Sequence, residues 1–117
     1  MYRVLSTSRN TSLLLSRNDV LAMAGFSVIS PRYPEQAPSL AAQQEVDAVV
    51  IGHSVEAPLR EEIIAAVRQM SPKCVICFVF AAPDTHGEPL ADVSLDVSNG
   101  PESLVLALQQ RLPRNAR

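Results

Sequence analysis

The stretch Asp47-Ala-Val-Val-Ile-Gly-His-Ser54 decides the fold of this chain. Its apolar part is uninterrupted and rich in β-branched residues, which is typical of a central parallel strand buried on both faces. A parallel strand needs long crossover connections, usually helices, to reach its neighbours. Open α/β sheets bind their ligands just beyond the carboxyl ends of such strands. The residues at that place here are Gly52, His53 and Ser54.

Working outward from this strand, apolar spacing and helix breakers predict that strands and helices alternate. Gly25 is expected to end the first helix as a left-handed cap, with Phe26 packed behind it. Pro58 and Pro101 are expected in the first turns of later helices. The predicted strands cover residues 2–7, 26–30, 47–52, 73–81 and 92–97, and the predicted helices cover 11–24, a weak segment from 38 to about 45, 58–70 and a last helix from 101.

The apolar positions of the helices predict which faces are buried. In the third helix these are Leu59, Ile63, Val67 and Met70, and in the last helix Leu104, Leu108 and Leu112. In the first helix they are Leu13, Leu14, Val20, Leu21 and Ala24.

This alternation predicts a single domain over residues 1–117, with residues 113–117 as a frayed tail. The fold class is α/β, a flavodoxin-like three-layer αβα sandwich whose five-stranded parallel sheet has the order 2-1-3-4-5. One connection departs from the pattern. Residues 81–91 contain two prolines and a glycine, so we expect a loop or a single turn in place of the fourth crossover helix.

The charge balance limits the class of partner. Ten Lys and Arg against twelve Asp and Glu give a formal net charge of −2, which supplies no global field for nucleic acid or an anionic membrane. The amino terminus lacks the pattern of a signal peptide, and no stretch approaches the roughly 18 apolar residues of a membrane span. We therefore expect a cytoplasmic protein that binds neither nucleic acid nor membrane.

Cys74 and Cys77 form a Cys-x-x-Cys pair inside a predicted strand. Residues i and i+3 of a strand point to opposite faces, so the two sulfurs diverge. No further metal ligands accompany them at a suitable spacing. We interpret both as buried structural thiols.

Four segments of the chain resemble the receiver domain of two-component response regulators, and together they extend over nearly its whole length. The segments are Arg3-Val-Leu5, Ala24-Gly-Phe-Ser-Val28, Asp47-Ala-Val-Val-Ile51 and Gly100-Pro-Glu-Ser-Leu104.

The resemblance implies a specific chemistry and the positions that perform it. Receivers accept a phosphoryl group on an aspartate that ends the third strand, beside Mg²⁺ held by acidic residues after the first strand, and a hydroxyl and a lysine sense the phosphoryl oxygens. Laid on this sequence, the acceptor falls on Gly52, the acidic pair on Ser8 and Arg9, the hydroxyl near Val79 and the lysine near Val97. None of these positions carries the required residue type.

We therefore expect a degenerate pseudo-receiver that is not an enzyme, carries no metal or cofactor, and acts by protein–protein contact in signal transduction without phosphorylation. Its partner is another protein, with a homodimer as one form of that contact. A less favoured variant retains phosphorylation at a non-standard acid, Asp84.

Polar residues at the strand ends support an alternative, a domain that binds a small molecule or a phosphate-bearing anion. The loop after the first strand resembles the phosphate loop of flavodoxins, although Arg9 stands where that loop prefers glycine. Histidines could also hold a metal or act as a general base beside Ser54, but their spacing matches no recognised metal motif. The structural interpretation is that the loop caps the first helix and Ser54 caps the third. The candidate ligand-binding residues are Ser6, Ser8, Arg9, Thr11, His53, Ser54, Asp84 and His86.

Overall fold

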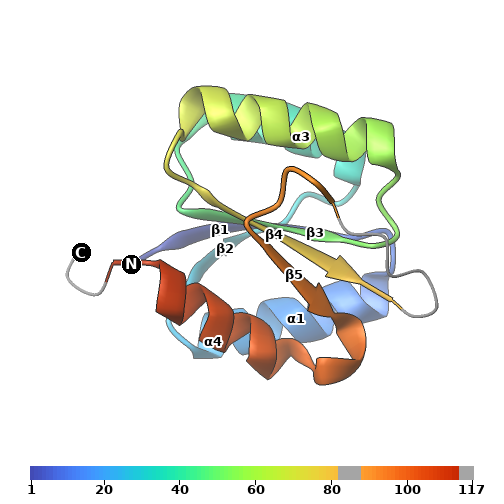
Figure 1. Ribbon diagram of the computed structural model, residues 1–117, viewed down its shortest axis with the longest axis vertical. Helices are drawn as coiled ribbons and strands as arrows, with labels where there is room; N and C mark the ends of the chain where they lie inside the picture. Colours follow the sequence, from blue (N-terminus) through green and yellow to red (C-terminus); the bar gives the residue numbers. More distant parts are fainter. Residues whose placement is uncertain (82–87, 114–117) are drawn as a thin grey trace.

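The computed structural model describes residues 1–81 and 88–113, which form a parallel β-sheet between two layers of helices (Figure 1). The five strands lie in the order β2-β1-β3-β4-β5, as the sequence predicts. The strands are β1 (Arg3–Thr7), β2 (Ser27–Ile29), β3 (Ala48–Gly52), β4 (Val75–Phe80) and β5 (Val93–Asp96). The helices are α1 (Thr11–Met23), α2 (Ala37–Gln43), α3 (Ala57–Met70) and α4 (Pro101–Arg111), with short 3-10 turns η1 (Pro34–Gln36) and η2 (Val97–Asn99).

Two apolar cores fill the space between the sheet and its helices. Helices α2 and α3 cover one face and α1 and α4 the other (Figure 1). Strand β3 is buried along its whole length, because its side chains alternate between the two cores. Val49 and Ile51 lie in the core under α3, whereas Ala48 and Val50 lie in the core over α1 and α4.

Helix α1 begins and ends as its sequence predicts. The Asn10 side chain caps the amino end by accepting a hydrogen bond from the Leu13 backbone at 3.1 Å. At the other end Gly25 has a φ of 98°, and the N–H groups of Gly25 and Phe26 donate to the carbonyls of Ala22 and Leu21. This is a Schellman motif, which satisfies carbonyls that the helix leaves open.

The buried face of α1 differs from the prediction. Leu14 and Leu21 are buried as expected, but Leu13 is 37% exposed and Ala24 is exposed. The third buried residue of the helix is Arg17. The prediction considers apolar residues alone and therefore leaves out Arg17, which lies three residues after Leu14 and four before Leu21 on the same helix face.

Strand β4 begins two residues later than predicted, because the Cys74 N–H donates to Ser71 in a turn. The thiols of Cys74 and Cys77 are both buried and belong to opposite cores, as predicted, although Cys74 lies in the turn just before β4. Burial raises the pKa of each thiol to about 12, since the thiolate is disfavoured away from water.

The connection between β4 and β5 contains no helix in its described part, residues 81 and 88–92. Two ion pairs hold this segment against α3 instead. Arg60 pairs with Glu88 at 3.0 Å, and Arg68 pairs with Asp92 at 3.1 Å. The fourth crossover helix of the flavodoxin-like pattern is therefore shortened, as the sequence predicts.

Candidate functional site

The candidate site lies at the carboxyl edge of the sheet, where β1, β3 and β4 end side by side. Thr7 pairs with Ile51, and Gly52 pairs with Val79. Ser8 therefore lies next to Gly52, and Val97 follows β5 at the same edge. Asp47 lies at the opposite end of β3, where its carboxylate accepts a hydrogen bond from the Arg3 backbone at 2.8 Å.

Gly52 is packed too closely to carry a side chain without movement of its neighbours. A Cβ at this position would lie 3.1 Å from Ser8 Oγ and 3.3 Å from Arg17 Nη2. Contacts of this length require the neighbour to give way by a few tenths of an ångström. Strand β3 therefore ends in a glycine whose nearest side-chain groups are the Ser8 hydroxyl and the Arg17 guanidinium.

Arg17 is the central charge of the site, and only 7% of its surface is exposed. Its Nη1 donates to Ser6 Oγ at 3.2 Å and to the Thr7 carbonyl at 3.0 Å. No carboxylate among the described residues forms an ion pair with it. Burial lowers the pKa of Arg17 to about 10, because desolvation disfavours the charged form.

Arg17 was missed by the sequence analysis, although the sequence contains a sign of it. Leu14, Arg17 and Leu21 have the i, i+3, i+7 spacing of one helix face. A cation within such an apolar row points into the core or into a polar site beneath the helix. Arg17 could therefore have been found by its spacing.

Ser54 links the loops after β1 and β3. Its Oγ accepts a hydrogen bond from the Arg9 backbone at 2.8 Å and lies 3.2 Å from Ser8 Oγ. The expectation that Ser54 caps the third helix is wrong, because the N-cap position of α3 is Glu56. The Ser54 hydroxyl instead bonds to the loop after β1.

The Arg9 guanidinium turns outward and binds two carboxylates. It pairs with Glu35 from η1 and with Glu56 at the start of α3. The hydrogen bonds from Arg9 hold the pKa of each carboxyl below its ordinary value, and they raise the pKa of Arg9. Arg9 thus connects the loop after β1, η1 and the start of α3 at the carboxyl edge of the sheet.

The candidate ligand-binding residues are brought together only in part. The hydroxyls of Ser6, Ser8 and Ser54 already have protein partners, whereas Thr11 and His53 are exposed. Asp84 and His86 lie outside the described residues. Within residues 1–81 and 88–113, no group of three His, Cys, Asp or Glu side chains could hold a metal ion.

Comparison with solved structures places this fold among receiver domains. The receiver domain of the sensor histidine kinase PA1611 from Pseudomonas aeruginosa, solved with magnesium in its active-site cleft, superposes with a TM-score of 0.77 at 16% identity over 94% of this chain and 96% of that chain. The chemotaxis response regulator CheY4 of Vibrio cholerae gives a TM-score of 0.76 at 21% identity, with 96% and 99% covered. A response regulator receiver domain from Clostridium thermocellum gives 0.80 at 13%, with 95% and 94% covered.

These similarities define the class of fold, that of the CheY-like receivers, over nearly the whole chain. No family model matches the sequence, and no curated protein sequence matches it significantly. In the described part of the chain, no helix is both long enough and apolar enough to cross a membrane.

Proposed function

We propose that this protein is a pseudo-receiver, which acts in signal transduction as a protein-interaction module without phosphorylation and without enzymatic activity. The proposal rests on one observation. Strand β3 ends in Gly52, and the buried guanidinium of Arg17 lies directly beside it. This supports the proposal, because the resemblance to receivers assigns the acceptor aspartate to position 52 and the Mg²⁺ ligands to the neighbouring loop after β1.

The chemistry of phosphoryl transfer explains why this pairing matters. Covalent transfer needs a carboxylate nucleophile, and Gly52 offers none. Mg²⁺ is held by oxygen ligands, usually carboxylates and water. The positions after β1 that would supply them are Ser8, whose hydroxyl is bonded to Ser54, and Arg9, which is positively charged. The fixed charge of Arg17 nearby repels a divalent cation further.

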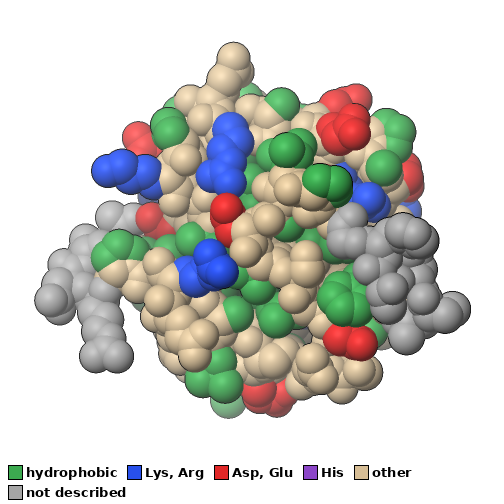
Figure 2. Space-filling model, in the orientation of Figure 1, with side chains coloured by type: hydrophobic (Ala, Val, Ile, Leu, Met, Phe, Trp, Pro, Cys, Tyr) green, Lys and Arg blue, Asp and Glu red, His purple; other side chains and the backbone are tan. Residues whose placement is uncertain are grey.

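The rest of the scaffold retains what an interaction module needs. A receiver-like fold without its chemistry still offers its outer helices as docking surfaces, since function is a property of sites on a fold. Figure 2 shows acidic and basic side chains interspersed on one face, with apolar groups between them. This mixed surface suits a protein partner better than nucleic acid, which favours a continuous basic patch.

The proposal predicts that the protein is not phosphorylated by acetyl phosphate. With Mg²⁺ present, intact-protein mass spectrometry should show no phosphoryl mass gain, and neither Mg²⁺ nor Mg²⁺ with beryllofluoride should shift the melting temperature. The Gly52→Asp variant should also stay unmodified, because Arg17 would pair with the new carboxylate.

The Asp84→Ala variant is the matched control for the non-standard acid. A stoichiometric mass gain in the wild type that is lost in Asp84→Ala would replace the pseudo-receiver proposal with a receiver phosphorylated at Asp84. A mass gain that persists in that variant would overturn the proposal as well and direct the search to another acid.

A further inference from the structure

A small pocket lies between α1 and α4, and Val79 and Val97 in its lining place it at the same edge of the sheet as Gly52. Its volume is about 70 Å³. Most of its wall is apolar, and Leu13, Val79 and Leu104 supply side chains from α1, β4 and α4.

Arg17 gives this pocket a buried positive charge. Its guanidinium uses Nη1 for Ser6 and Thr7, and no carboxylate among the described residues neutralises it. A buried charge is costly unless it is paired. An anionic group in the pocket would supply the missing partner through charge-assisted hydrogen bonds, the strong class of such bonds.

The start of α4 adds a second favourable contribution for an anion. Gly100 and Pro101 line the pocket, and Gly100, as the N-cap residue, provides no side chain to cap the helix. The amino end of a helix carries a partial positive charge, which is the contribution that α4 offers here, because Pro101 has no N–H and the Ser103 N–H donates to the Gly100 carbonyl. Glu102, the acidic residue of this first turn, is exposed and is not part of the pocket lining.

Size and charge limit the class of ligand. One water needs about 10–15 Å³ of such a volume, so the pocket has room for about five or six non-hydrogen atoms. Asp96 also lines the pocket, and its carboxylate accepts a hydrogen bond from Ser98 at 2.9 Å. The negative charge of Asp96 repels every anion, and it repels a dianion such as phosphate more strongly than a monoanion. The apolar wall favours a ligand with a short hydrocarbon part.

We infer that the pocket between α1 and α4 binds a small organic monocarboxylate, with its carboxylate on Arg17 and its hydrocarbon part against Leu13, Val79 and Leu104. The pocket shares Arg17, Val79 and Val97 with the strand edge but includes no residue of the loop after β1, and the inference does not depend on whether the protein is phosphorylated.

Titration of the ¹⁵N-labelled full chain with isobutyrate tests the inference, with isobutyramide as the uncharged ligand of equal size. Isobutyrate should give saturable shifts of the backbone amides of Ser16, Arg17 and Ser103, and isobutyramide should give none. Arg17→Met should weaken isobutyrate binding by about tenfold or more, as expected for loss of a hydrogen bond to a charged group.

A second variant tests the pocket with Arg17 in place. Ser16 is an exposed residue of α1 that lines the pocket, whereas Ser12 is exposed on the same helix and does not. Ser16→Phe should block binding, and the matched control Ser12→Phe should leave it unchanged. Equal binding of isobutyramide, retention of binding in Arg17→Met, or the absence of saturable shifts at the three amides would each overturn the inference.

Discussion

Two arginines near the strand edge differ in burial and in whether a carboxylate pairs with them. Arg17 is buried beneath α1 without a carboxylate partner in the described chain, whereas Arg9 is on the surface with two. Surface ion pairs usually contribute little to stability because water screens them. We therefore expect the main role of Arg9 to be structural, because its two ion pairs connect the loop after β1 with η1 and with the start of α3.

Acid should weaken the contribution of Arg9 to stability. The pKa values of Glu35 and Glu56 are lowered by Arg9 from the ordinary 4.5, so the contribution is complete above that pH and is lost as the pH falls through the lowered values. The difference in unfolding free energy between wild type and Arg9→Ala should thus shrink below about pH 4.5, measured by urea unfolding across pH.

Arg32→Ala is the matched control for this prediction. Arg32 lies over the Tyr33 ring at 5.5 Å, and it forms no ion pair with another described residue. Its effect should not change over the same pH range. Parallel stability curves for wild type and Arg9→Ala would contradict the assignment.

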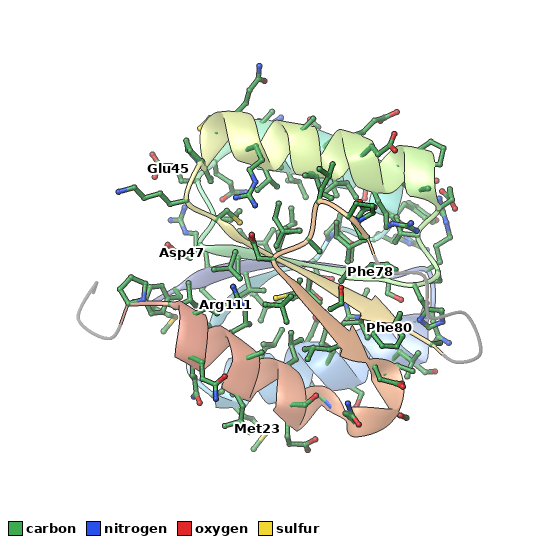
Figure 3. All side chains as sticks on the ribbon, viewed as in Figure 1. Met23, Glu45, Asp47, Phe78, Phe80 and Arg111 are labelled. Carbon is green, nitrogen blue, oxygen red and sulfur yellow. The ribbon has the colours of Figure 1, made fainter. Side chains whose placement is uncertain are left out.

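At the scale of elements, the connection that replaces the fourth crossover helix is held by charged contacts. The Glu88 side chain is only 5% exposed and pairs with Arg60, which also donates to the Val55 carbonyl at 2.7 Å. Phe78 lies on the face of the sheet that α3 covers (Figure 3), and Arg60 lies over its ring at 4.7 Å. One arginine thus covers an aromatic core residue and anchors the connection.

Glu88→Gln should destabilise the protein by about 3 kcal/mol, because it leaves a largely buried guanidinium without its counter-charge. The measurement is urea unfolding, with Glu62→Gln as a control on the exposed side of α3. In a double-mutant cycle with Arg60→Met, the loss caused by Glu88→Gln should nearly disappear. Equal losses in both backgrounds would show that the pair does not couple.

At the scale of the whole molecule, the sheet is the shared wall of two cores. Ile63 lies at the centre of the core under α3, and Leu108 at the centre of the core between the sheet and α4. Both are fully buried. Because β3 contributes side chains to both cores, loss of packing in one core should also destabilise the other.

Ile63→Ala and Leu108→Ala should each lower the unfolding free energy by about 2–5 kcal/mol, the range for truncation of a buried large aliphatic side chain. Each variant should unfold in one transition, with the same denaturant dependence as wild type, when followed by circular dichroism and by tyrosine fluorescence. Separate transitions for the two probes would show that the layers unfold independently.

The sequence alone is enough to predict the sheet order, the caps of the first helix and the shortened fourth crossover. Each of these depends on local chemistry, namely the apolar run at residues 48–51, the left-handed Gly25 and the breakers in residues 81–91. The side-chain contacts across the strand edge could be seen only in the folded chain. The contacts of Ser54 with Ser8, and of Arg9 with Glu56, join residues 46 and 47 positions apart, and the spacing of residues carries no information on such distant partners. Arg17 illustrates both levels. Its spacing within α1 predicts that it faces inward, but only the folded chain shows that it lies against Gly52.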